Sequence, residues 1–147
     1  MFECLLRVRF LECDPQGVVF NGRYVDYVDV VMTEYFRAVI GDYAVFQANG
    51  IELVVVNVNV NWKASARADQ VIRITVSKTS LGNSSMTFAL EFSDADSGSA
   101  IAEASVTYVA VDSQSFAKCA VPEELKHQFN QEIGAYKVDL SGVHQSG

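Results

Sequence analysis

The sequence predicts an α+β domain in which one long helix packs against an antiparallel sheet of five strands. Three observations predict this class. One amphipathic helical pattern covers residues 24–40, and most of the expected strands follow it along the chain. Several of these segments alternate between two sets of side chains, as half-buried strands do. Turn sequences such as Gly82-Asn83 separate the later strands. One helix beside a meander of strands is an α+β layer arrangement.

The first elements are a strand over residues 2–11 and the helix over residues 24–40, joined by a turn-rich loop. Asn21 is expected to cap the helix, because its side chain can accept a hydrogen bond from a free N–H of the first turn. Gly41 fits the left-handed position just past a helix C-terminus. The apolar stripe of the helix consists of Val25, Val28, Val31, Met32, Tyr35, Phe36, Val39 and Ile40.

Four more strands are expected over residues 51–62, 69–79, 85–93 and 100–112. The first of these alternates along its whole length. One face would carry Val54, Val56, Val58, Val60 and Trp62, and the other Val55, Asn57, Asn59 and Asn61. The asparagine face suggests a solvated or partner-facing edge rather than a substrate site.

The C-terminal part is expected to add little to the fold. Pro122 and the two acids after it open a short helix, since proline and negative charge both suit a helix N-terminus. After Ala135 the residues become small and polar, so a flexible tail is expected. The 147 residues carry no repeat or linker, which predicts a single domain over residues 1–147 with its core at about residues 3–112.

Composition narrows the classes of function. The formal net charge of -7 argues against nucleic-acid binding, and no apolar run reaches the ~20 residues of a membrane helix. Cys4, Cys13 and Cys119 are an odd number and lack metal-ligand spacing. With no secretory leader pattern at the start of the sequence, they favour a reducing cytoplasm.

Asp14 lies in the turn-rich loop just ahead of the expected helix start. A helix N-terminus offers free N–H groups and a partial positive charge, which can polarise a carbonyl. An acid beside such a helix end is a minimal site for acyl hydrolysis. Two alternatives exist: Asp14 only caps the turn, or the neighbouring Cys13 acts as nucleophile. No histidine lies near Cys13 in the sequence, so a small buried side chain is the more natural reading.

The loop and helix resemble hotdog-fold acyl-CoA thioesterases, specifically the 4-hydroxybenzoyl-CoA thioesterase and YbgC-like group. The similar stretch spans residues 7–112, and its most specific part is Asp14-Pro15-Gln16-Gly17-Val18-Val19-Phe20 followed by Tyr24. Thr33-Glu34-Tyr35 in the helix and Lys78-x-x-x-Gly82-x-x-Ser85 also match. The resemblance implies a hotdog fold, in which the sheet wraps the long helix.

The resemblance also implies thioester hydrolysis without a metal or a cofactor other than the CoA of the substrate. Asp14 would attack the thioester directly or activate water, and N–H groups around Asn21, Gly22 and Arg23 would polarise its carbonyl. Many relatives carry histidine or an aromatic residue where this chain has Asn21. This difference puts the substrate preference in doubt.

Substrate contacts follow from the same resemblance. Residues 63–78 contain Lys63, Arg67, Arg73 and Lys78 against Asp69 alone, and Lys63 and Arg67 are candidates to contact the CoA phosphates. A solvated strand edge is the alternative. Gly82 and Ser85 match positions near the pantetheine and nucleotide path, or simply form a hairpin turn. Gly17 and Val19 would border the substrate, and the acyl pocket candidates are Phe20, Tyr24, Tyr27, Phe46 and Trp62, each of which also suits a core.

Relatives build the site between subunits, so a homodimer or homotetramer is expected. Glu34 is then a structural acid at the dimer seam, and Asp26 and Asp29 are solvated or face a partner. A hotdog dehydratase would need a histidine with an acid, but the chain has only His127 and His144, both near the C-terminus. The main alternative is a non-catalytic module that binds acyl-CoA or an acyl-carrier protein.

Overall fold

The structure, a computed structural model, describes residues 1–142 and contains one six-stranded sheet instead of five strands. The strand order is β2-β5-β4-β3-β1-β6. All neighbours pair antiparallel except β1 and β6, which are parallel. The strands are β1 (Phe2–Arg7), β2 (Ile51–Trp62), β3 (Val71–Leu81), β4 (Ser85–Asp94), β5 (Ala100–Asp112) and β6 (Tyr136–Asp139).

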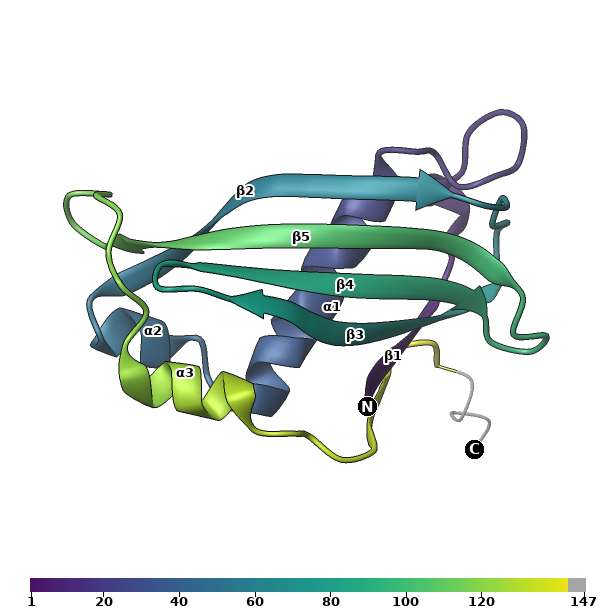
Figure 1. The fold of residues 1–147 in the computed structure, drawn as a ribbon. Coiled ribbons are helices and arrows are strands. Elements are labelled where there is room, and N and C mark those ends of the chain that lie inside the picture. Colours follow the sequence, from purple (N-terminus) through teal and green to yellow (C-terminus); the bar gives the residue numbers. More distant parts are fainter. Residues whose placement is uncertain (143–147) are drawn as a thin grey trace.

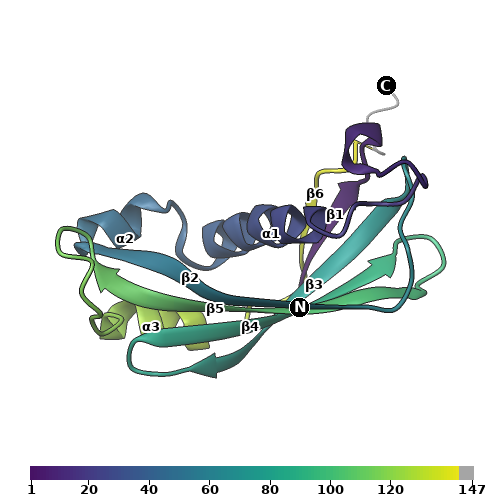
Figure 2. The ribbon, with the colours of Figure 1, turned by 90° about the horizontal axis from the view of Figure 1, so that it is seen from above.

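The long helix α1 (Arg23–Ile40) crosses one face of this sheet, and the sheet curves around it (Figures 1 and 2). This confirms the hotdog arrangement. The helix ends at Gly41, whose φ of 86° is favourable for glycine and whose N–H donates to the Arg37 carbonyl oxygen. Two short helices, α2 (Ala44–Ala48) and α3 (Glu123–Asn130), lie near the C-terminal end of α1 (Figure 1). The α2 turn was not expected from the sequence.

Aromatic side chains close the core at this end of α1. The Phe36 ring packs against the rings of Phe46, Phe88, Tyr108 and Phe129, with centroids 5.2–6.0 Å apart. Such edge-to-face contacts add to the stabilisation from buried area. Phe46 is fully buried in this cluster, which favours the core alternative over a place in an acyl pocket.

The first strand is shorter than expected, because the chain turns at Arg9. The Glu12 carboxylate accepts a hydrogen bond from the Arg9 backbone N–H, at 2.7 Å, and draws residues Phe10–Glu12 into a short 3₁₀ helix. Phe10 and Leu11 are consequently 82% and 85% exposed instead of alternating with buried positions. Strand β3 also begins two residues late, after Asp69 adopts a φ of 71°.

Strand β2 contains a bulge that changes its faces. Val55 pairs with Tyr108 and Asn57 with Thr107, so Val56 is an extra residue without a partner of its own. Val55 therefore joins the helix-facing side with Val58, whereas Val56 does not. The expected face that linked Val54 and Val56 to Trp62 is wrong, because strict alternation assumed an unbroken ladder.

The C-terminal segment also differs from expectation. Residues 136–139 were expected in a flexible tail, but they form β6 and pair with β1. The outer edge of β1 offers backbone groups that a further strand can satisfy, and Arg7 Nε adds a 3.0 Å hydrogen bond to the Ser141 carbonyl oxygen. His144 lies outside the described residues. No helix between residues 1 and 142 is long and apolar enough to cross a membrane.

Candidate active site

Asp14 lies next to the turn of a small hairpin, residues 12–20, that leads into α1. The Phe20 N–H donates to the Glu12 carbonyl oxygen at 2.9 Å, and the Asp14 N–H donates to the Val18 carbonyl oxygen at 2.8 Å. The turn closes when the Gly17 N–H donates to the Asp14 carbonyl oxygen, also at 2.9 Å. Gly17 has a φ of 80°, which explains a glycine at this position.

The two oxygens of the half-buried Asp14 carboxylate have different surroundings. Oδ1 accepts the backbone N–H of Gln16 at 2.9 Å and that of Val18 at 3.4 Å. These bonds show that Asp14 does brace its own turn. The other oxygen, Oδ2, has no hydrogen-bond partner within residues 1–142. One oxygen therefore fixes the carboxylate, and the other can act on a bound molecule.

The helix start differs from the sequence prediction, because the N-cap is Gly22 and the Asn21 side chain makes no capping bond. The chain enters α1 through tight turns instead. The Arg23 N–H donates to the Phe20 carbonyl oxygen at 2.9 Å, so Arg23 is already satisfied. In the described part of the chain, the N–H groups of Asn21 and Gly22 have no acceptor. These two groups are the ones that can meet an oxygen from outside.

A shallow pocket of about 280 Å³ opens beside this helix start. Buried Val19 and Tyr24 lie beneath it, and the half-exposed Trp62 borders it with its ring edge-on to that of Tyr24, 5.8 Å between centroids. The Phe20 ring is exposed and lies against Gly22, where an added Cβ would stand only 3.1 Å from it. The remaining lining residues are Val18, Asn21, Lys63, Ala64 and Ser65.

Most of the cations that the sequence offered for phosphate binding are engaged elsewhere. Lys63 pairs with Glu103 at 2.8 Å, and the hydrogen bond that its ammonium group donates to the Glu103 carboxylate raises the pKa of Lys63. Arg73 pairs with Glu3 at 3.1 Å, and Lys78 hydrogen-bonds Asn130. Arg67 differs, since no carboxylate within residues 1–142 forms an ion pair with it.

Arg67 belongs to the Asp14 region. Its backbone pairs with Val18, and its guanidinium Nη1 lies 3.9 Å from where a Cβ on Gly17 would stand. Gly82 and Ser85 are placed differently, because they form the β3–β4 turn with a 2.8 Å bond from the Gly82 N–H to the Ser85 carbonyl oxygen. This turn lies at the opposite end of the sheet from the Asp14 loop (Figure 1). A single chain therefore does not bring them together.

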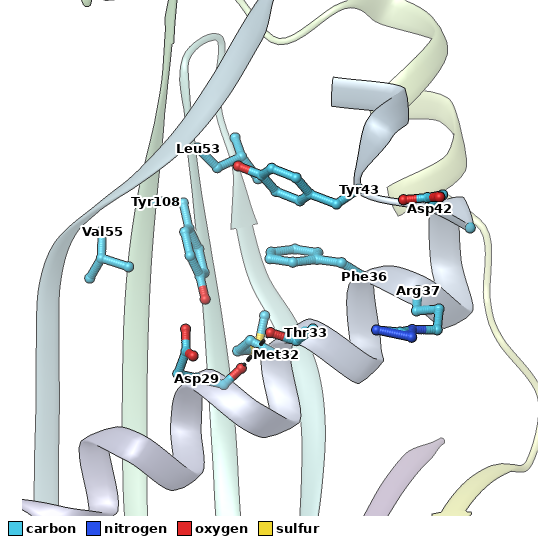
Figure 3. Close-up of a pocket in the computed structure, with 11 residues that line it drawn as sticks. Asp29, Met32, Thr33, Phe36, Arg37, Asp42, Tyr43, Leu53, Val55 and Tyr108 are labelled. Carbon is cyan, nitrogen blue, oxygen red and sulfur yellow. Dashed lines mark hydrogen bonds between the residues drawn. The ribbon is translucent and has the colours of Figure 1, made fainter. Parts of the chain in front are cut away.

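A second cavity, larger than the shallow pocket, was not predicted from the sequence. It measures about 640 Å³ and lies between α1 and strands β2 and β5. Figure 3 shows Asp29 and Tyr108 with their oxygens facing each other across its wall. Burial, together with the nearby Asp29 charge, raises the pKa of Tyr108. The other lining residues are Met32, Thr33, Phe36, Arg37, Gly41, Asp42, Tyr43, Leu53 and Val55. Their spacing on α1 is visible in the sequence, but their meeting with β2 and β5 is not.

The other titratable candidates lie apart from Asp14. Glu34 is partly buried and pairs with Arg37 at 3.7 Å, and Asp26 pairs with Arg23 at 3.3 Å. His127 lies on α3 beside Gln131, at the opposite end of α1 from the loop. Within residues 1–142 no cluster of three or more histidines, cysteines or acids is placed to hold a metal ion.

Comparison with known proteins identifies the family of the chain. The model of the family described as the thioesterase-like superfamily matches residues 8–129. The chain is 28% identical over 131 residues to the acyl-CoA thioester hydrolase YbgC of Escherichia coli, covering 89% of this chain and 97% of that protein.

Solved structures share the fold. The probable thioesterase YbaW of Escherichia coli superposes with a TM-score of 0.78 at 22% identity, covering 91% of this chain and 100% of that one. Slr0204, a 1,4-dihydroxy-2-naphthoyl-CoA thioesterase from Synechocystis, gives a TM-score of 0.79 at 16% identity, covering 87% and 94%. Because the family model spans most of the sequence, the chain belongs to the thioesterase-like superfamily.

Proposed function

We propose that this protein hydrolyses an acyl-CoA thioester to a free acid and CoA, with Asp14 as its catalytic carboxylate. The proposal is carried by one loop that holds both the Asp14 carboxylate, with its Oδ2 unpartnered within residues 1–142, and the helix start with the acceptor-free N–H groups of Asn21 and Gly22. Family membership and the 28% identity to an acyl-CoA thioester hydrolase support the same reaction.

The chemistry needs a base or nucleophile and a way to stabilise negative charge on the carbonyl oxygen. Asp14 either removes a proton from water or attacks the carbonyl carbon itself. The N–H groups of Asn21 and Gly22, at the positive end of α1, would receive the developing oxyanion. The C–S bond then breaks, and the sulfur leaves as the thiol of CoA. In the first route the water oxygen enters the free acid, and the proton taken up by Asp14 passes to the leaving thiolate. In the second route the acyl group stays on Asp14 as a mixed anhydride, which a water molecule then hydrolyses to the free acid and the regenerated carboxylate.

The substrate would lie between α1 and β2, along the line that joins the shallow pocket at Tyr24 and Trp62 to the 640 Å³ cavity lined by Asp29; we call this path the trough. The cavity is of the size that small-molecule pockets usually have. We assign the acyl group to this trough. The nucleotide of CoA would extend outward past Gly17 to Arg67, the cation there without an ion-pair partner.

A second copy of the chain would complete the site. The bare edge of β2 exposes Val54, Val55 and Val56, and exposed apolar edges are surfaces on which another chain pairs. Val25 and Val30 on α1 are also exposed. A homodimer formed across β2 would cover the trough.

The central test measures thiol release from a panel of aromatic and aliphatic CoA esters with wild type and with Asp14→Asn. We expect the variant to fold normally and to hydrolyse its best substrate roughly a hundredfold more slowly or worse, the scale for a central catalytic group. Asp26→Asn is the matched control, since this exposed acid in the first turn of α1 should leave the rate unchanged.

Near-normal hydrolysis by Asp14→Asn would remove Asp14 from the mechanism. Tight binding of CoA esters with no turnover by the wild type would instead favour the non-catalytic binding module. Arg67→Ala should weaken the binding of CoA esters and leave the binding of thioesters that lack the nucleotide unchanged. Equal losses on both substrates would give Arg67 a structural role only.

A further inference from the structure

Glu12 is a buried acid at the base of the hairpin that carries Asp14. The residue is only 6% exposed, and both carboxylate oxygens are fully engaged. Oε1 accepts the Arg9 backbone N–H at 2.7 Å and the Tyr27 hydroxyl at 2.9 Å. Oε2 accepts Nε and Nη2 of the Arg9 guanidinium at 3.1 and 3.0 Å. Neither oxygen is left for solvent or substrate.

These bonds tie the hairpin to α1. Tyr27 lies one turn inside the helix and is 4% exposed, so its hydroxyl reaches Glu12 from within the core. The Glu12 carbonyl oxygen also accepts the Phe20 N–H at 2.9 Å, which closes the base of the hairpin. The hairpin, the helix start and the Glu12–Tyr27 bond thus form a closed ring. That ring contains both Asp14 and the N–H groups of Asn21 and Gly22.

The charge on Glu12 strengthens this connection. Burial alone would raise the pKa of Glu12, but the hydrogen bonds from the Arg9 amide, the Tyr27 hydroxyl and the Arg9 guanidinium together hold it below its ordinary value. The carboxylate is therefore ionised at neutral pH. A hydroxyl that donates to an ionised carboxylate makes a stronger bond than one between neutral groups.

We propose that Glu12, which accepts a hydrogen bond from the Tyr27 hydroxyl, is a positioning residue that orients the Asp14 carboxylate relative to the helix N-terminus for thioester hydrolysis. This inference rests on the proposed function. Without the Glu12–Tyr27 bond, no side-chain hydrogen bond within residues 1–142 would join the hairpin to α1. A displacement of about 1 Å in a reacting group can cost ~100-fold in rate.

The test compares kcat and KM for Tyr27→Phe and Glu12→Gln on the best CoA ester, each in the wild-type and the Asp14→Asn backgrounds. Tyr27→Phe removes only one hydroxyl. We expect it to lower kcat roughly tenfold with KM changed less than about twofold, as for loss of alignment and not of binding. In the Asp14→Asn background the same change should have no further effect, because the group being aligned is gone.

Tyr35→Phe is the matched control. Tyr35 is another buried tyrosine of α1, at 5% exposure, and its hydroxyl has no hydrogen-bond partner within residues 1–142. It should leave kcat unchanged.

Equal losses from Tyr27→Phe in both backgrounds, or the same loss from Tyr35→Phe, would show a general folding defect and overturn the role of Glu12. Unchanged kcat in Tyr27→Phe and Glu12→Gln would overturn it as well. If Asp14→Asn alone keeps a normal rate, the assignment of Asp14 fails first and takes this proposal with it, so the two failures are distinguishable.

Discussion

The two edges of the sheet are finished in different ways. At one edge the four-residue strand β6 covers β1, and short edge strands offer little to a further chain. At the other edge the twelve-residue strand β2 is bare, and its Val54–Val56 segment is exposed. The Asp14 loop, the shallow pocket and the 640 Å³ cavity all border β2 or its end. Strand β6 thus closes one edge, whereas β2 leaves the other edge open at the place where the proposed substrate and partner would bind.

A charge placed on the open edge of the sheet should have the largest effect. Val56→Lys puts an ammonium group at a 57% exposed position of β2, and lysines on edge strands oppose pairing. We expect the proposed dimer to become monomeric and thioester hydrolysis to fall by roughly a hundredfold, about 2.7 kcal/mol of barrier. Sedimentation velocity and thiol release measure the two effects.

Ser77→Lys, an exposed position on β3, is the control for added charge and should change neither measurement. A Val56→Lys protein that kept both its oligomeric state and its rate would contradict an interface at β2.

A charge on the closed edge should act on stability instead. Val138 on β6 is partly buried and packs against the core, so Val138→Asp would bury a carboxylate among apolar groups. We expect the free energy of unfolding to fall by about 2 kcal/mol. Urea denaturation measures this loss, while kcat per folded molecule should stay constant. Lys137→Asp on the same strand is exposed and should cost less than about 0.5 kcal/mol. A large loss of kcat in Val138→Asp would contradict a role of β6 in stability alone.

Gly17→Ala tests the Asp14 loop, which lies at the end of the open strand β2. Gly17 has a φ of 80°, a conformation that costs an L-residue about 1–2 kcal/mol. The added methyl group would also approach the Arg67 guanidinium. We expect a loss of about 1 kcal/mol in stability together with weaker binding of CoA esters, seen as a raised KM. Gly98→Ala, with a φ of 77° in the β4–β5 turn, is the control. It should lose similar stability with an unchanged KM.

The smallest expected effect concerns pH. Because the pKa of Glu12 is lower in the folded protein than its ordinary 4.5, its bonds stabilise the fold fully above that pH. The contribution disappears as pH falls through the folded-state pKa. Between pH 5 and pH 3, wild type should therefore lose more stability than Glu12→Gln. Parallel stability curves for the two proteins would show that Glu12 is not held in its ionised form.

Sequence patterns predicted the parts of the fold that depend on local periodicity. The apolar stripe of residues 24–40 identified α1 to within one residue, and the strands after it were found with small shifts. The bulge at Val56 was missed, since an extra residue leaves the chemical alternation of the sequence intact. Strand β6 was missed because four polar and apolar residues gain their structure only from the unpaired edge of β1.

The candidate site was predictable only in part for the same reason. Asp14 and the helix start are neighbours in sequence, so their proximity follows from the loop. The engagement of Lys63 by Glu103 and of Tyr27 by Glu12 depends on residues far apart in the chain. The 640 Å³ cavity likewise forms where α1 packs against β2 and β5. Composition and spacing carry no information about such meetings.

The parallel pairing of β1 with β6 has a consequence for synthesis. Residues 2–5 are synthesised long before residues 136–139, the partners with which they pair. Contacts of such large sequence separation form slowly. The nascent chain must therefore carry an unpaired outer edge of β1 until residues 136–139 have been made, and chaperones would have to protect that edge until then.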